Sequence, residues 1–264
     1  MAVETITSRH NALLTHLRKL GSSRAYREEC GEYLGDGVKL LHEALKWNAP
    51  LKTALFSESV PIPPLPDGVR IVRVSAELMR SVSPAETPQG ALFTARLERP
   101  ALPERLDGAR YLILDGVQDP GNVGTILRTA DAFDCDGVFL TGACADLYNP
   151  KTVRATMGAV FRQRVWVCAA DEAAALLRAS GLPLYGAALR GDTVSLRGVD
   201  LSRAAVAIGS EGRGLSGELL SLCGRTVRIP MSERCESLNA ASAAAVVLWE
   251  MYSCCNINCS NHAI

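Results

Sequence analysis

The chain has 264 residues, 48% of them apolar, and 28 basic residues balance 28 acidic ones, so the net charge at neutral pH is zero. This length is enough for one large domain or two small ones. A zero net charge excludes a global attraction to nucleic acid or membrane, so any such binding must rest on a local patch.

No apolar run approaches the length of a bilayer span, and the first residues, MAVETITSRHNALL, lack the basic-then-apolar order of a signal peptide. We therefore expect a soluble, cytoplasmic protein.

The nine cysteines contain no CxxC pair. A zinc site in the tail (Cys254, Cys255, Cys259 and His262) follows no standard finger spacing, so we expect free thiols and no metal.

Residues 1–97 alternate helical and strand patterns and predict a small α/β domain. Ser8 is the expected cap of a helix that runs through Leu20, and Asp36 the expected cap of a helix over VKLLHEALKW. Predicted strands follow at LKTALF (51–56), VRIVRV (69–74) and GALFTARL (90–97), and the segment PIPPLPDG (61–68) is a loop.

Between residues 9 and 27 lie five basic residues and no acidic one. Such a cluster is typical either of a solvated helix face or of a contact with an RNA phosphate backbone, and the sequence leaves both interpretations open. The candidate RNA-binding residues are Arg9, Arg18, Lys19, Arg24 and Arg27.

Residues 98–108, ERPALPERLDG, are charged and contain two prolines, which is typical of a linker. Beyond it strands and helices alternate again through residues 109–253, which predicts a mostly parallel sheet covered on both faces. The predicted strands are YLIL (111–114), GVFL (137–140), RVWV (164–167), LPLYGAAL (182–189), AAVAI (204–208) and RTVRI (225–229). Helices are expected from Pro120, from Asn149–Pro150, after a cap at Asp171, and over about 237–252; the Cys-rich tail 254–264 has no assigned role.

Three polar loops follow apolar strands. In the first, Asp119 is the predicted N-cap and Pro120 the first residue of a helix, so a helix N-terminus meets the end of a strand. In open α/β sheets this place holds ligands, although an ordinary strand–helix turn has the same residues.

The second loop is GSEGRG (209–214), and the third runs from 229 to 239 as IPMSERCESLN, before a helix of small residues. Glu211 stands where a dinucleotide fingerprint would have its second glycine, which disfavours a nicotinamide or flavin enzyme of ordinary doubly wound fold. Singly, each loop has a structural explanation: Glu211 as a surface acid, Ser237 as an N-cap and Asn239 as a first-turn residue. Together, three loops at strand ends predict one pocket.

These loops resemble, in order and spacing, the three signature motifs of the SpoU (TrmH) family of RNA ribose 2′-O-methyltransferases. The matching segments are NVGTILRTA (122–130), IGSEGRGL (208–215) and IPMSERCESLN (229–239). The N-terminal segment ITSRHNALLTHLRKL is similar to the L30e-like RNA-binding domain that is often fused to this catalytic domain.

The resemblance implies a SPOUT-type α/β domain with a C-terminal trefoil knot at 109–253, preceded by an L30e-like domain at 1–97. In the family, the knot binds S-adenosylmethionine, and the protein is a homodimer with its site near the subunit interface. The residues that match the family's cofactor contacts are Gly209, Ile229, Met231 and Leu238.

The polar motif residues match the family's catalytic set: Asn122, Arg128, Glu211, Ser237 and Asn239. Arg128 stands at the position of the catalytic arginine. Because a guanidinium stays protonated in proteins, we expect Arg128 to bind the RNA phosphate and orient the ribose, with Glu211 as its ion partner. Asn122 and Asn239 are expected to fix the ribose and the loops by hydrogen bonds.

The resemblance implies methylation of a ribose 2′-hydroxyl, and the L30e-like domain favours ribosomal RNA, with 23S rRNA as the expected target, over transfer RNA. A tRNA 2′-O-methyltransferase and a non-catalytic RNA-binding protein of the same fold remain alternatives. Glu233, where the family usually has a glycine, favours the non-catalytic alternative, whereas the five retained polar motif residues argue against it.

Overall fold

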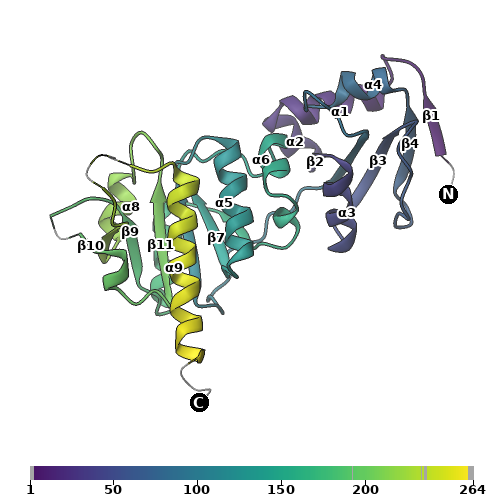
Figure 1. The fold of residues 1–264 in the computed structure, drawn as a ribbon. Helices are drawn as coiled ribbons and strands as arrows, with labels where there is room; N and C mark the ends of the chain where they lie inside the picture. The colour runs from purple at the N-terminus through teal and green to yellow at the C-terminus, as the bar shows by residue number, and fades with distance from the viewer. Residues whose placement is uncertain (1–2, 192, 233, 235–236, 261–264) are drawn as a thin grey trace. The chain divides into compact units, whose positions relative to one another are not determined.

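The computed structural model describes residues 3–191, 193–232, 234 and 237–260, with side chains through Cys254 at the C-terminal end. The chain forms two compact units. The first unit consists of Met1–Glu98 together with Asp146–Arg162, and the second unit consists of Arg99–Ala145 together with Gln163–Ile264 (Figure 1). Each unit has its own sheet and its own core.

The first unit has a five-stranded mixed sheet in the order β1-β4-β3-β5-β2. Parallel pairing joins β1 and β3 to β4, and antiparallel pairing joins β5 to β3 and β2. The strands are β1 (Val3–Ile6), β2 (Glu32–Asp36), β3 (Leu51–Ser57), β4 (Arg70–Val74) and β5 (Ala91–Arg96). The helices are α1 (Ala12–Ser22), α2 (Arg24–Cys30), α3 (Val38–Lys46), α4 (Ala76–Val82), α6 (Pro150–Ala155) and the short 3₁₀ helix η1 (Ala159–Phe161).

Two predicted helix caps of this unit are wrong. Helix α1 is capped by Asn11, whose side chain accepts from the Leu13 N–H at 2.9 Å, and not by Ser8. Helix α3 begins after Gly37, which has no side chain to cap it. Asp36 is instead the buried last residue of β2, and its carboxylate accepts a hydrogen bond from the Ser83 hydroxyl at 2.5 Å.

The second unit has a seven-stranded parallel sheet in the order β10-β12-β9-β11-β6-β7-β8. The strands are β6 (Arg110–Asp115), β7 (Gly137–Thr141), β8 (Val165–Val167), β9 (Leu184–Ala187), β10 (Val194–Ser195), β11 (Ala204–Gly209) and β12 (Arg225–Arg228). The helices are α5 (Pro120–Ala132), α7 (Ala170–Ala179), α8 (Gly217–Leu222), α9 (Ala240–Ser260) and the 3₁₀ helix η2 (Leu196–Gly198). The predicted parallel α/β sheet is confirmed.

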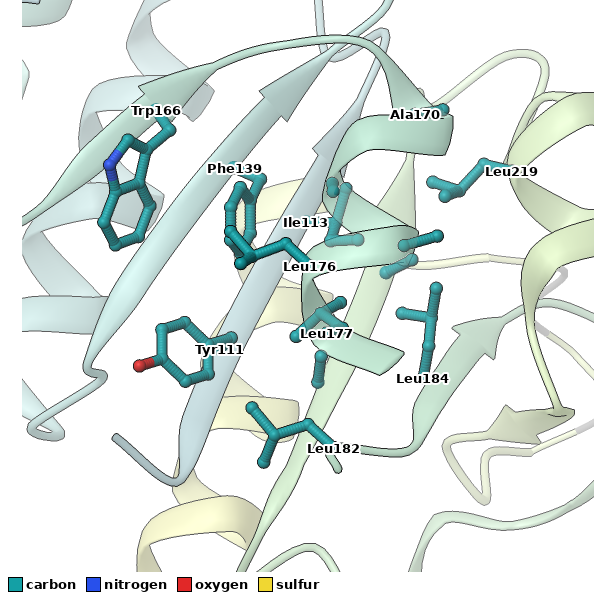
Figure 2. Packing of buried hydrophobic residues seen from close by; sticks show 14 of the residues in the cluster. Tyr111, Ile113, Phe139, Trp166, Ala170, Leu176, Leu177, Leu182, Leu184 and Leu219 are labelled. Atoms are coloured by element: carbon teal, nitrogen blue, oxygen red, sulfur yellow. The ribbon is translucent and has the colours of Figure 1, made fainter. Parts of the chain in front are cut away.

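The predicted cap Asp119, with Pro120 after it, is confirmed, and so is the predicted helix start at Asn149–Pro150, where Asn149 is the N-cap. The cap of α7 is Ala169 rather than Asp171, and the Ala169 N–H is bonded to the Glu172 carboxylate at 2.9 Å. One core cluster packs α7 onto the strands through aromatic and leucine side chains, among them Tyr111, Phe139 and Leu177 (Figure 2).

Helices α5 and α9 lie side by side (Figure 1). The small and apolar residues of α9 that face the protein are buried: Ala240, Ala244, Val247, Leu248 and Met251.

No helix in the described part of the chain is long and apolar enough to cross a bilayer. All six cysteines whose side chains are described are free thiols.

Candidate functional site

The first two signature loops begin at the same edge of the second sheet. Strands β6 and β11 are parallel neighbours, and their last residues, Asp115 and Gly209, are paired in register. Because parallel strands end at one edge, the loops that follow them meet there. Strand β12 in the same sheet leads into the third loop.

A cavity of about 480 Å³ is lined by the second and third of these loops. All four predicted cofactor residues line it: Gly209, Ile229, Met231 and Leu238. Glu211 and Ser237 from the predicted catalytic set line it as well, and so does the segment 187–189 after β9. The volume is in the range of small-molecule sites, which is roughly 300–1,000 Å³.

The second loop forms a tight turn directly after Gly209. Reciprocal backbone hydrogen bonds of 3.1 and 2.9 Å join Ser210 and Gly214. A Cβ on Gly209 would lie 2.0 Å from the carbonyl carbon of Gly214, so any side chain there would displace the loop. Gly214 itself has a positive φ of 66°, which glycine adopts without strain. Both glycines are therefore required for the shape of the cavity wall.

Asn122 connects the three signature loops through its side-chain amide. Its Nδ2 donates to the Glu211 carboxylate, and its Oδ1 accepts from Asn239 Nδ2 at 3.2 Å. Asn239 also caps α9, because its Oδ1 accepts from the Ala241 N–H at 2.9 Å. Three residues that are far apart in sequence thus form one hydrogen-bonded chain beside the cavity.

Arg128 is not part of this chain. It is exposed on α5 and does not line the cavity. On an ideal helix it lies about 9 Å beyond Asn122 and about 240° around the axis. The expected ion pair between Arg128 and Glu211 does not form within the described chain, where the Glu211 carboxylate accepts from Asn122 instead. Glu233, the departure from the family pattern, lies outside the described residues.

Asp115 is a buried residue of the site that the sequence analysis did not single out. Its carboxylate accepts from the Ser216 N–H at 2.7 Å and from the Thr141 hydroxyl at 3.1 Å. It therefore ties the end of the second loop to the sheet. The sequence contains a signal that could have identified Asp115. An acidic residue that directly follows a wholly apolar strand is expected to be buried and to need hydrogen-bond donors there.

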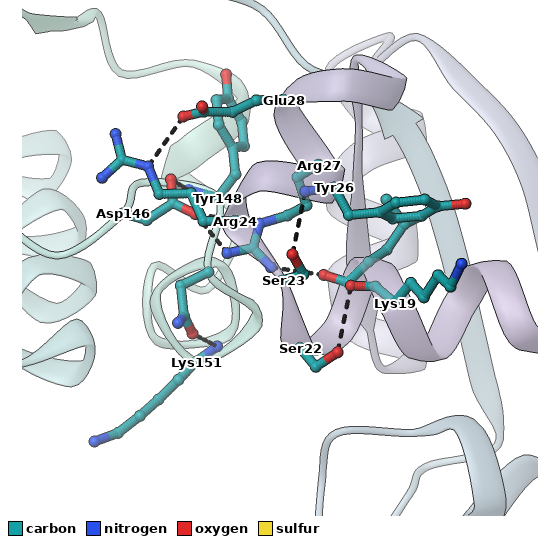
Figure 3. A network of polar contacts seen from close by, with 12 residues as sticks. Lys19, Ser22, Ser23, Arg24, Tyr26, Arg27, Glu28, Asp146, Tyr148 and Lys151 are labelled. Carbon is teal, nitrogen blue, oxygen red and sulfur yellow. Dashed lines mark hydrogen bonds and ion pairs between the residues drawn. The ribbon is translucent and has the colours of Figure 1, made fainter.

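The candidate RNA-binding cluster of the first unit is largely engaged in intramolecular contacts. Arg27 is only 3% exposed; it contacts the Asp146 carboxylate at 2.6 Å and donates to the Leu20 carbonyl at 2.6 Å (Figure 3). The other contacts are ion pairs of Arg9 with Glu77 and of Arg24 with Glu28, Lys19 over the ring of Tyr26, and Arg18 on the carbonyls of Arg9 and Ser81. Burial leaves the Arg27 guanidinium inaccessible to a phosphate in this conformation.

Comparison with known proteins agrees with this geometry. Residues 109–249 match the family model described as the SpoU rRNA Methylase family, and residues 11–92 match the one described as the MRM3-like substrate binding domain. The 23S rRNA (guanosine(2553)-2′-O)-methyltransferase RlmP of Bacillus subtilis is 32% identical over 94% of this chain and 99% of its own length. The 23S rRNA (uridine(2479)-2′-O)-methyltransferase of Streptomyces viridochromogenes is 33% identical over 94% of this chain and 92% of its own.

Among solved structures, the S-adenosylmethionine-bound rRNA methyltransferase of Sinorhizobium meliloti superposes with a TM-score of 0.84. It is 29% identical, and the match covers 95% of this chain and 98% of that one. Because the family model spans more than half of the sequence and both units have a counterpart in these relatives, the chain belongs to the SpoU rRNA methylase family.

Proposed function

We propose that this protein transfers the methyl group of S-adenosylmethionine to a ribose 2′-hydroxyl of 23S ribosomal RNA, in the cytoplasm and as a homodimer. The observation that carries the proposal is the cavity lined by the second and third signature loops in a member of this family, with Asn122 of the first loop hydrogen-bonded to Glu211 of its lining. The relatives named above that act on 23S rRNA match nearly the whole chain, which favours ribosomal over transfer RNA.

The cavity fits the cofactor. Its lining combines apolar side chains, such as Ile229 and Leu238, with backbone that is free of side chain at Gly209. Glycine there lets backbone amide and carbonyl groups approach a ligand closely. Bound in this cavity, S-adenosylmethionine would supply an electrophilic methyl group on a sulfonium sulfur.

The protein's part in the reaction is positioning. A neutral hydroxyl is a weak nucleophile, and holding it in line with the methyl carbon gives much of the rate. In the proposal, Asn122, Glu211, Ser237 and Asn239 orient the ribose at the rim of the cavity, and Arg128 holds the adjoining phosphate. The 2′-hydroxyl oxygen would form the new bond to the methyl carbon as the methyl–sulfur bond breaks with its electron pair going to sulfur, which would leave as a neutral thioether, and the hydroxyl proton would leave to a neighbouring acceptor or water.

The finer features of the family belong to the same proposal. They are a trefoil knot within 109–253, an L30e-like architecture for 1–97, a linker at 98–108, and a separate tail at 254–264. In support, the second and third loops, which would form the knot, line one cavity. The mixed β-sheet of the first unit is in keeping with a small RNA-binding module.

An apolar stripe on α9 supports the dimer. Val246 and Trp249 are exposed at helical spacing, and Trp249 is 54% exposed. The Trp249 ring packs edge-on against Phe133 and beside Tyr252, which extends the stripe into an aromatic patch. Contiguous apolar surface of this kind marks protein contacts in soluble proteins.

Methyl transfer from tritiated S-adenosylmethionine to in vitro transcribed 23S rRNA tests the proposal, with a transfer RNA pool as the competing substrate. We expect label in 23S rRNA and loss of at least tenfold in turnover for Arg128→Ala, with cofactor binding unchanged by calorimetry. Label in transfer RNA alone would contradict the assigned substrate, and unchanged turnover would remove Arg128 from the mechanism.

A further inference from the structure

The first unit contains a polar cavity of about 450 Å³. Its walls come from the end of β2 and the start of α3, from the loop before β5, and from helix α6 and the turn after it. A second cavity, of about 380 Å³, shares Glu86, Thr87 and Gln89 with it. Neither cavity belongs to the methyl-donor site described above.

The larger cavity is made by two regions of the sequence that match different families. Asp36, Lys39 and Gln89 lie in the part that matches the substrate-binding domain. Arg154 and Met157 lie in the part that matches the methylase family, in the segment 146–162 that packs within the first unit. A ligand in this cavity would therefore touch residues of both family regions at once.

Two cations of the lining are available to a ligand. Lys39 and Arg154 are exposed, and neither makes a side-chain hydrogen bond or ion pair with another residue of the described ranges, although the charge of Arg154 opposes the rise that burial causes in the pKa of the nearby Asp36 carboxyl. This separates them from the basic cluster at 9–27, whose cations are engaged. No side chain caps the first turn of α3 beside Lys39, which leaves its backbone donors open to an acceptor.

Met157 is held in a strained conformation at the same cavity. Its φ is +50°, in the left-handed region that residues other than glycine rarely adopt, and its side chain is 45% exposed. A flexible thioether that remains exposed suits a face on which an unstacked base can lie. Strained residues that persist on a surface are concentrated at binding sites.

The rest of the lining offers hydrogen bonds of both kinds. The Gln89 amide lies at the start of α3, where its Oε1 is 3.0 Å from the position of a Cβ on Gly37. Asp36 and Glu86 add acceptors. Carboxylates and amides are the groups that read base edges, and exposed lysine and arginine contact phosphates.

From these observations we infer that the cavity binds an unpaired nucleotide of the RNA substrate, with its base between Met157 and Gln89 and its phosphates at Lys39 and Arg154. Recognition of RNA by protein is directed mostly to such splayed-out bases in loops and bulges. This inference rests on the proposed function and adds an RNA contact outside the methyl-transfer site.

The first test measures the affinity of the full chain for in vitro transcribed 23S rRNA by filter binding. The double variant Lys39→Gln/Arg154→Gln removes both exposed cations of the lining. We expect at least a tenfold higher Kd, and a slope of log K against log salt that is smaller by about 1.4, or about 0.7 for each lost contact with a single strand. The matched control is Lys46→Gln/Lys151→Gln, which removes exposed cations from the same two helices but outside the cavity.

The second test separates binding from stability. Met157→Gly relieves the positive φ and so should not lower the unfolding temperature, yet it should weaken RNA binding severalfold. Met157→Leu keeps an apolar surface and should restore binding. Cross-linking of a 4-thiouridine-substituted transcript is expected at segments 84–89 and 154–157.

The outcomes are distinguishable. Unchanged RNA affinity in the cavity variants, with 23S rRNA still methylated by the wild type, overturns this inference and leaves the proposed function standing. Equal losses in the cavity variant and the Lys46/Lys151 control overturn it as well, because they indicate a diffuse charge effect. A wild-type protein that methylates no RNA overturns the proposed function itself, and this inference with it.

Discussion

The side-chain amide of Asn239 makes two kinds of contact, and substitutions can separate them. Its oxygen caps α9 through the N–H groups of Ala241 and Ser242, and its nitrogen donates to Asn122. Asn239→Asp keeps the cap, because a carboxylate suits a helix N-terminus, but it removes the donor to Asn122. We expect unchanged thermal stability and about fivefold slower methyl transfer, which is the effect of about 1 kcal/mol from one lost hydrogen bond.

Asn239→Ala is the matched variant, because it removes both contacts. Loss of the cap is expected to lower the free energy of unfolding by about 1 kcal/mol, measured by urea denaturation. Full activity in Asn239→Asp would mean that the contact with Asn122 has no part in turnover.

Glu32 makes the stability of the first unit dependent on pH. Burial raises the pKa of Glu32, but hydrogen bonds from Lys52 at 2.8 Å and from His16 at 3.4 Å outweigh burial, and the pKa is lowered from its ordinary value of 4.5. A carboxyl whose folded pKa lies below its unfolded pKa contributes stability above the unfolded value, and this contribution is lost as the pH falls through the folded value.

Lys52→Met should therefore lower the free energy of unfolding at pH 7 by about 0.5 kcal/mol, a small effect because the Lys52 side chain is 42% exposed and its charge is screened by solvent. The difference from wild type should shrink when urea denaturation is repeated at pH 4. A difference that stays constant with pH would show that the lost stability comes from the packing of the lysine stem.

The four residues predicted to contact the cofactor do line one cavity, but single charges were misjudged. Gly209, Ile229, Met231 and Leu238 follow the ends of recognisable strands, so their convergence could be predicted. Arg27 looked like a free cation because its partner, Asp146, lies 119 residues further along the chain. A local pattern cannot reveal a partner at that separation.

At the scale of elements, the interior strands of both sheets were predictable, whereas three of the four edge strands were missed. The predicted strands of the second sheet correspond to β6, β7, β8, β9, β11 and β12. The missed strands are β1, β2 and β10, each at an edge of its sheet. Edge strands need fewer apolar residues, as in β1, where three of the four residues are exposed.

The close packing of α9 requires small side chains at its buried face. Ala244 is fully buried in a helix that packs against α5 and β11. Ala244→Leu should lower the free energy of unfolding by about 1–3 kcal/mol, because added methylenes in a packed interior force neighbours to move. Ala132→Leu, at an exposed position of α5, is the control and should leave stability nearly unchanged.

Chemical denaturation of the two variants measures the difference. Equal stability of Ala244→Leu and wild type would mean that α9 can shift away from α5 without loss. The small residues of this helix would then need an explanation other than close packing.

At the scale of the whole molecule, the chain returns to its first unit after leaving it. Residues 146–162 pack with residues 1–98. The buried ion pair between Arg27 and Asp146 joins these two segments of the chain. Asp146→Ala would leave a buried guanidinium without its counterion, which should lower the free energy of unfolding by about 3–5 kcal/mol.

Arg27→Met combined with Asp146→Ala should recover part of that stability, since the remaining site is apolar and uncharged. Urea denaturation of the single and double variants gives the coupling. Stability losses that simply add would contradict a direct pairing of the two residues.

The exposed surface of α9 predicts that the whole molecule forms a dimer. The aromatic patch around Trp249 on α9 would be covered in a dimer, whereas an isolated chain leaves it in water. Light scattering should give twice the 28.2 kDa of one chain.

Trp249→Lys should shift the mass to that of a monomer, because it places an unpaired charge in the contact. Trp47→Lys, which replaces an exposed tryptophan of the first unit, should remain dimeric. A Trp249→Lys protein that keeps the dimer mass would place the contact elsewhere. A monomeric variant that still binds S-adenosylmethionine but no longer transfers methyl groups would indicate that the cavity is complete in one chain and that catalysis needs the second, in keeping with an Arg128 that lies outside the cavity of its own chain.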